Sequence, residues 1–296
     1  MVKEFLLGDN PFIGISHLAQ VKARAEKKEA TLQNKVNVIK AAIEGGATGF
    51  TFSTHPANLE LFECISNNYS KILNKLNYYI LVPYVASYVR RSNILGTPSL
   101  AKWFIRNALT TQSLSIDTLL AVITINPNKL FKAFIMNELM SYFKILPIER
   151  VKSILLHEIL TDLIIAYNII NPIKYLAKLL KKEFDIELGL ESRNIERLND
   201  FLTQNRLDIV YVMTPLNPLN YQVATINKSI DELVDLLSEK SEIIAINIMA
   251  SGAVSLDEAI KYLKKFRDKI YAVTSATTRP ERAYKNFQQF KRQLIE

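Results

Sequence analysis

The sequence predicts an α/β protein of the TIM-barrel class, a (β/α)8 barrel with a helical insertion after its third strand. Three observations lead to this class. Strand-like and helix-like segments alternate along the 296 residues, the strand-like segments number eight, and most of them are continuous apolar runs. Continuous apolar runs are typical of parallel strands that are covered on both faces. Eight βα units in a chain of this length favour a closed barrel over an open doubly wound sheet.

The predicted strands are short segments rich in branched and aromatic residues. They cover residues 4–9, 48–54, 78–85, 151–158, 185–191, 207–214, 243–250 and 269–276. An amphipathic helical segment follows most of them. The helix in "TLQNKVNVIKAAIEGGA" ends at Gly45 and Gly46, and the helix in "SIDELVDLLSEK" begins at Ser229 with Glu232 three residues later, which is a capping-box pattern.

One connection is much longer than the others. Residues 92–148 contain "PSLAKWFIRNAL", "SIDTLLAVI" and "NPNKLFKAFIMNELMSYFKIL", which predict two or three apolar helices. We expect a single TIM-barrel domain over residues 1–296, with residues 92–148 as a helical insertion within it. Two roles for the insertion stay open: it packs on the barrel wall or in a homo-oligomer contact, or it forms a lid over the site.

Composition limits the class of protein. Hydrophobic residues make up 49% of the chain and charged residues 22%, which is a globular balance. The net charge of +8 comes from basic residues that alternate with acidic ones on helical segments, so we expect no nucleic-acid partner. Cys64 is the only cysteine, the first residues do not form a signal peptide, and no apolar run reaches the about 20 residues of a membrane span. We therefore expect a cytoplasmic protein with no membrane association.

Polar residues gather where the predicted strands end, which is the catalytic face of a TIM barrel. The three histidines of the chain all fall there. Histidine handles protons near neutral pH, and carboxyl groups pair with it in acid–base catalysis. The predicted catalytic residues are His157, Glu191, His55 and Asp9. Because neighbours on a strand point to opposite faces, we expect His157 to point inward and Glu158 to begin the loop or pair with a helix residue.

The loops after the seventh and eighth strands carry small polar residues before a helix start, and Arg279 adds a positive charge. Such loops hold anions through backbone N–H groups, so we expect an anionic or phosphorylated small-molecule substrate. The predicted substrate-binding residues are Asn10, His17, Tyr84, Asn247, Ser251, Gly252, Ser275, Thr277 and Arg279. A divalent metal stays an open alternative, with Asp9, His17, His55, His157 and Glu191 as candidate ligands.

Several stretches resemble the aldo-keto reductase superfamily, a TIM-barrel family that binds NADPH. These are "AAIEGGATGFTFSTHPANLELFECI", "ILLHEI", "IELGLESRNIERL", "YVMTPLNPL" and "YAVTSATTRPERAYKNFQQF". The resemblance implies that His157 stands at the family's catalytic histidine. It also implies that Arg279 and Asn286 retain a place for a nucleotide phosphate or a phosphorylated substrate.

Most of the family's catalytic residues are missing. The resemblance places Thr51 at the family's catalytic Asp, Pro56 at its Tyr, and Pro83 or Tyr84 at its Lys. The residues that hold the nicotinamide in the family fall on Glu191, Ser192 and Met213.

Three functions follow as hypotheses. The first is an enzyme that acts on a small anionic metabolite by acid–base chemistry, as a lyase, isomerase or hydrolase, with or without a metal. In that reading His157 and Glu191 exchange protons and Arg279 binds the anionic group. The second is an atypical NAD(P)H-dependent oxidoreductase, implied by the resemblance. The third is a non-catalytic barrel whose insertion binds another protein.

Overall fold

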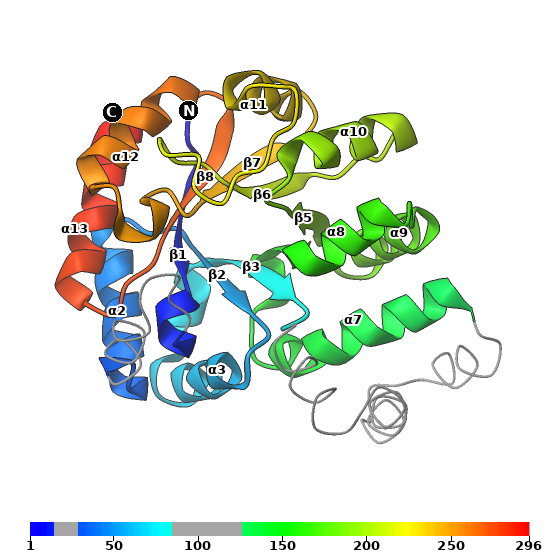
Figure 1. Cartoon of the computed structure of the whole chain (residues 1–296). Helices are drawn as coiled ribbons and strands as arrows, with labels where there is room; N and C mark the ends of the chain where they lie inside the picture. The colour runs from blue at the N-terminus through cyan, green and yellow to red at the C-terminus, as the bar shows by residue number, and fades with distance from the viewer. Residues whose placement is uncertain (15–28, 85–125, 296) are drawn as a thin grey trace.

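In a computed structural model the chain forms a closed barrel of eight parallel strands (Figure 1). The structure describes residues 1–14, 29–84 and 126–295. Strand order follows chain order, and β1 pairs with both β2 and β8 to close the ring. The strands are β1 (Glu4–Gly8), β2 (Gly49–Ser53), β3 (Asn77–Val82), β4 (Val151–Leu156), β5 (Glu187–Glu191), β6 (Tyr211–Pro215), β7 (Glu242–Ile246) and β8 (Ile270–Ser275). The predicted (β/α)8 barrel and all eight predicted strands are confirmed.

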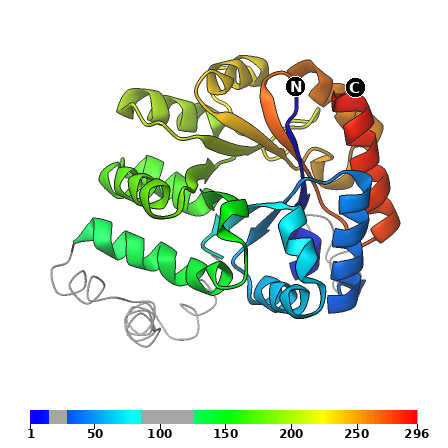
Figure 2. The same ribbon diagram turned by 180° about the vertical axis from the view of Figure 1, so that it is seen from behind.

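Helices surround the barrel, as seen from both sides in Figures 1 and 2. They are α2 (Leu32–Gly45), α3 (Pro56–Tyr69), α7 (Pro127–Phe143), α8 (Glu158–Ala166), α9 (Asn171–Phe184), α10 (Ile195–Asn205), α11 (Ile230–Ser238), α12 (Leu256–Leu263) and α13 (Pro280–Phe290). Short helical turns join them: η1 (Asn10–Ile13), η2 (Ser70–Lys75), η3 (Ile148–Arg150), η4 (Ala250–Gly252), η5 (Lys264–Phe266) and the π-helical η6 (Lys291–Ile295).

Helix ends follow the capping residues in the sequence. The Ser229 side chain accepts the backbone N–H of Glu232 at the start of α11, and Gly46 takes φ +111° directly after α2. Glycine adopts this left-handed conformation at no steric cost, which explains where α2 ends. Gly45 also lets α2 approach α13, because a Cβ there would meet the backbone of Tyr284.

The interior of the barrel holds two kinds of layer. Leu6, Leu155, Met213 and Ile244 pack inside the ring, as alternation along each strand requires. At the amino ends of the strands the layer is polar. Glu4 Oε1 accepts hydrogen bonds from Asn77 Nδ2 (2.8 Å) and from the Tyr271 hydroxyl (3.1 Å), so this end is held by a carboxylate shared between β3 and β8.

The predicted insertion is described only in part. Its last helical segment is α7, and residues 92–125 of the predicted 92–148 range lie outside the described residues. The expectation of one domain with this insertion stays a prediction. Among the helices that the structure describes, none is long and apolar enough to cross a bilayer. A cytoplasmic location stays a prediction as well.

Candidate active site at the carboxyl ends of the strands

Two of the three histidines cap helices at the carboxyl rim of the barrel. His157 directly follows β4, and its Nδ1 accepts the backbone N–H of Ile159 (3.3 Å) at the start of α8. His55 follows β2, and its Nδ1 accepts the backbone N–H of Ala57 (3.0 Å) at the start of α3. A ring nitrogen that accepts a hydrogen bond carries no proton, so in the neutral ring of His157 the hydrogen is on Nε2. The His157 imidazole can therefore donate a hydrogen bond from Nε2.

His157 and Glu191 lie beside each other on the interior side of the barrel. Leu155 pairs with Gly189 and Leu156 with Leu190, so His157 and Glu191 each follow the last paired position of their two adjacent strands. Leu155 packs inside the barrel, and a Cβ on Gly189 would meet the Leu155 side chain. Both residues lie two positions further along their strands, on that same side.

Burial leaves both groups uncharged at neutral pH. Loss of solvent raises the pKa of Glu191 to about 8, and the nearby Glu158 carboxylate raises it further. Loss of solvent lowers the pKa of His157 to about 4, with Arg193 acting in the same direction. The pair thus consists of a carboxylic acid that still holds its proton and an imidazole that holds one hydrogen, on Nε2.

Glu158 is the first residue of α8, and its carboxylate forms an ion pair with Arg193 in the loop after β5. Its backbone N–H donates to Glu191 Oε2 at 3.0 Å. Burial raises the pKa of Glu158 and the pairing with Arg193 opposes that rise. The predicted strand ran to residue 158, but β4 ends at Leu156 because His157 and Glu158 already begin the helix.

Asp9, predicted to be catalytic, ties three elements together. Its Oδ2 accepts the backbone N–H of Ser53 (2.9 Å), the Ser53 hydroxyl (2.9 Å) and the side-chain amide of Asn58 (2.6 Å). Asp9 is only 7% exposed, and burial raises its pKa against the opposing hydrogen bonds. These hydrogen bonds hold the end of β1 to the end of β2 and to α3, so the Asp9 side chain stabilises the fold at this place. The next residue, Asn10, is exposed at the start of η1.

The loop after β2 forms a second polar cluster with α7. The His55 ring lies edge to face with the Tyr84 ring, 4.5 Å between centroids, and the Tyr142 hydroxyl donates to the His55 carbonyl oxygen (2.8 Å). Thr54 donates to Glu138 and accepts the backbone N–H of Tyr84. Sequence reasoning missed Glu138 and Tyr142. The sequence offered no signal for them, because α7 carries other polar residues such as Lys132 and Asn137 that look the same in the sequence.

In the loop after β7, backbone N–H groups donate hydrogen bonds to acceptors within the same loop. The Ser251 N–H donates to Asn247 Oδ1 (2.9 Å), and the Gly252 N–H donates to the Met249 carbonyl (2.8 Å). The Asn247 amide donates to Gln222. These predicted substrate-binding residues thus lie together, but the N–H groups that would hold an anion are already used within the loop.

The loop after β8 already holds a carboxylate. Glu29 Oε2 accepts the Thr278 hydroxyl (2.9 Å) and lies 3.9 Å from Arg279 Nε. The Thr277 hydroxyl accepts the Arg279 N–H, and the Ser275 hydroxyl accepts the amide of Asn286 between β8 and α13. Thr278 and Arg279 therefore bind a negative group, the Glu29 carboxylate, directly before α13, whose start has no side-chain cap.

The metal alternative gains no support from the described residues, which contain no group of three His, Cys, Asp or Glu placed to hold an ion. His17, a candidate ligand and substrate-binding residue, lies outside the described residues. His55 and His157 stand on different strands, each with Nδ1 used for capping.

Comparisons with known proteins define the fold. No protein-family model matches the chain, and no curated protein matches it. Among solved structures, a Pseudomonas aeruginosa protein assigned as an aldo-keto reductase matches with TM-score 0.57 at 14% identity, over 100% of this chain and 92% of its own. An aldo-keto reductase of Bombyx mori in complex with NADP matches with TM-score 0.53 at 10% identity, over 97% and 83%. An aldo-keto reductase enzyme from a deep-sea metagenome library matches with TM-score 0.52 at 13% identity, over 87% and 80%.

The chain thus has a TIM-barrel fold similar to that of aldo-keto reductases, as the resemblance in the sequence led us to expect. Thr51 lies within β2 and Pro56 is the first residue of α3. The leading expectation of a lyase, isomerase or hydrolase is wrong: the three solved structures named above are aldo-keto reductases, which favours the oxidoreductase alternative. Shared fold does not fix activity, and identities of 10–14% define the fold alone.

Proposed function

We propose that the protein is an atypical reductase of small carbonyl compounds that uses a nicotinamide nucleotide. The observation that carries this proposal is the pair of uncharged hydrogen-bond donors at the ends of β4 and β5, His157 and Glu191. Reduction of a carbonyl needs a donor that polarises the oxygen and an acid that protonates it. The likeness to aldo-keto reductases, one of them in complex with NADP, agrees with this chemistry.

The nucleotide fits the loop after β8. Arg279 and the uncapped start of α13 suit a phosphate, and Glu29 is a stand-in for it, since its carboxylate already binds Thr278 and Arg279. When bound, the reduced nucleotide would supply a hydride to the carbonyl carbon.

The chain's own residues would handle the proton. His157 donates from Nε2 to the carbonyl oxygen and stays neutral, because a ring with a pKa near 4 does not gain a second proton at pH 7. Glu191 Oε2 accepts the Glu158 N–H, which leaves Oε1 to carry the proton that passes to the oxygen. Glu191 thus takes the part that a tyrosine plays in the family. Its pKa of about 8 keeps it protonated at neutral pH and still able to release the proton.

The direct test is a titration of the purified full chain with NADPH, followed by nucleotide fluorescence, together with loss of absorbance at 340 nm in the presence of a panel of short aldehydes and ketones. The expected result is saturable binding and carbonyl-dependent oxidation of NADPH that declines above about pH 8, as Glu191 ionises. Absence of both binding and oxidation would overturn the proposal and favour a non-catalytic barrel.

A further inference from the structure

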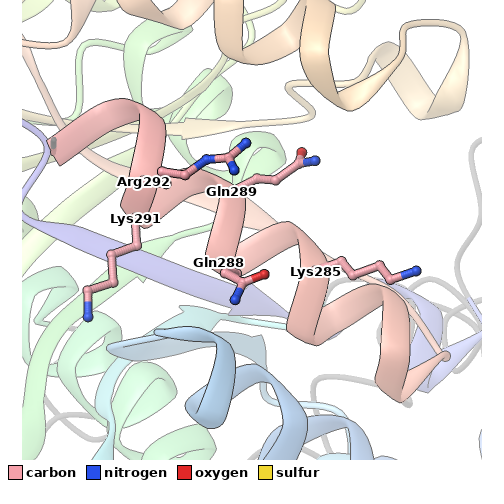
Figure 3. Close-up of a pocket in the computed structure, with 5 residues that line it drawn as sticks. All are labelled: Lys285, Gln288, Gln289, Lys291 and Arg292. Atoms are coloured by element: carbon pink, nitrogen blue, oxygen red, sulfur yellow. The ribbon is translucent and has the colours of Figure 1, made fainter.

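A cavity on the last helix, away from the barrel mouth, is lined by several positively charged side chains. It measures about 430 Å³, and the described residues that line it are Lys285, Gln288, Gln289, Lys291 and Arg292 (Figure 3). All five belong to α13 and the π-helical turn η6 that follows it. Lys285, Gln289 and Arg292 project to the same side of the helix, and Gln288 and Lys291 project from the neighbouring face (Figure 3).

None of the three cations is neutralised within the described part of the chain. The ion pairs there involve other residues, and the lining of the cavity contains no carboxylate. Lys264 of η5 does not line the cavity; its Nζ donates to Gln293 Oε1 (3.3 Å) on η6. Like charges held together repel one another, and an anion removes that cost.

The backbone is unusual at the same place. The α-helical pattern changes to a π-helical turn at Lys291, directly after α13. Gln289 Oε1 is buried with no hydrogen-bond partner among the described residues. This oxygen is an acceptor and needs a donor, whereas the amide nitrogen of the same side chain is the atom that can donate to a phosphate oxygen.

We propose that this cavity is a binding site for a small polyphosphate, such as the di- or triphosphate of a nucleotide, separate from the barrel mouth. Lys285 and Arg292 are seven residues apart, which is about 10 Å along a helix. A single phosphate group is too small to contact both, whereas a chain of two or three phosphates spans that length. The lining offers guanidinium, ammonium and amide donors, which suit phosphate oxygens.

The test is calorimetric titration of the full chain with inorganic tripolyphosphate, with orthophosphate as the comparison anion. The parent protein is expected to bind tripolyphosphate about tenfold or more tighter than orthophosphate. A variant with Lys285→Gln, Lys291→Gln and Arg292→Gln is expected to lose about tenfold or more in affinity. The matched control is Lys174→Gln, Lys178→Gln and Lys182→Gln, which removes three exposed charges from one face of α9 and is expected to bind as the parent does.

Three outcomes would overturn the proposal. Equal losses in both triple variants would mean that only net charge matters. Loss on Arg279→Gln with none in the cavity variant would place the anion at the loop after β8. Equal binding of orthophosphate and tripolyphosphate would refute the spanning argument. Thermal melting of each variant without ligand checks that the fold is kept, and none of these results depends on reductase activity.

Discussion

The backbone N–H of Glu158 donates to Glu191 Oε2 at 3.0 Å, while the side chain of Glu158 pairs with Arg193. One residue thus both anchors the buried carboxyl group and places a negative charge near it. That charge raises the pKa of Glu191, and the Arg193 guanidinium lowers the pKa of both Glu191 and His157. The ionisation of the pair therefore depends on a neighbour from the loop after β5.

Arg193→Gln should raise the pKa of His157 from about 4 toward its ordinary value of 6.5, because the positive charge that disfavours the protonated ring is gone. With only three histidines in the chain, their imidazole signals can be followed by NMR across the pH range. Arg197→Gln is the control, since Arg197 is exposed on α10. A midpoint for His157 that does not move would contradict the role given to Arg193.

His157→Asn should lower kcat for carbonyl reduction by about 10²- to 10³-fold with little change in melting temperature. Asparagine is a good helix cap and can replace Nδ1 as acceptor for the Ile159 N–H, but it is too short to reach the position of Nε2. Steady-state kinetics and thermal melting on the same preparations separate the two effects. Full activity in this variant would remove His157 from the mechanism.

Glu191→Gln should flatten the dependence of stability on pH. The pKa of Glu191 is raised from 4.5 to about 8 on folding, so the folded state holds a proton that the unfolded state has lost between these values. The stabilising effect is complete below about pH 4.5 and falls as pH rises to about 8, by at most about 1.4 kcal/mol per pH unit. Urea unfolding at pH 5, 7 and 9 measures this. The parent should lose stability relative to the variant, and parallel curves would mean that Glu191 is ionised in the fold.

Glu29→Gln should tighten binding of NADPH by about three- to tenfold, because the carboxylate that competes for Thr278 and Arg279 becomes neutral. The gain should shrink at high salt, since the contacts are partly exposed. Glu239→Gln, at an exposed position after α11, provides the control for net charge. Weaker binding in Glu29→Gln would show that this loop does not receive the nucleotide.

Tyr142→Phe should lower the free energy of unfolding by about 0.5–1.5 kcal/mol, because the variant loses one of the hydrogen bonds to the carbonyl oxygen of His55, which still accepts the backbone N–H groups of Asn58 and Leu59. Tyr142 is only 3% exposed, so water cannot easily take the place of the hydroxyl. Denaturant unfolding measures the loss. Phe143→Leu is a useful comparison on the same helix, since it changes packing without removing this hydrogen bond. An unchanged stability in Tyr142→Phe would mean that the loop after β2 does not depend on α7.

Much of the fold could be predicted from the sequence because each strand is a local apolar run between helices. The end of β4 was placed two residues too late, since an apolar run does not reveal that His157 already caps a helix. From the sequence, His157 and Glu191 could be placed only at the same carboxyl end of the barrel, and not next to each other. Their closeness depends on the register between β4 and β5, which no local pattern encodes.

The loops were harder to predict than the strands. Small polar residues after β7 and β8 indicated an anion site, but the sequence does not show that Asn247 binds the Ser251 N–H or that Glu29 reaches Thr278. Glu29 and Thr278 are 249 residues apart in the chain. Such contacts form only when the barrel closes, and therefore composition and spacing cannot reveal them.

At the opposite end of the barrel, Glu4 accepts hydrogen bonds from Asn77 on β3 and Tyr271 on β8, two strands that are far apart in the chain. An aliphatic side chain at position 4 would leave the Asn77 amide and the Tyr271 hydroxyl without their acceptor, at a cost that no single substitution can repair. Relatives of this barrel are therefore expected to show covariation among positions 4, 77 and 271, so that the three polar residues are kept together or replaced together.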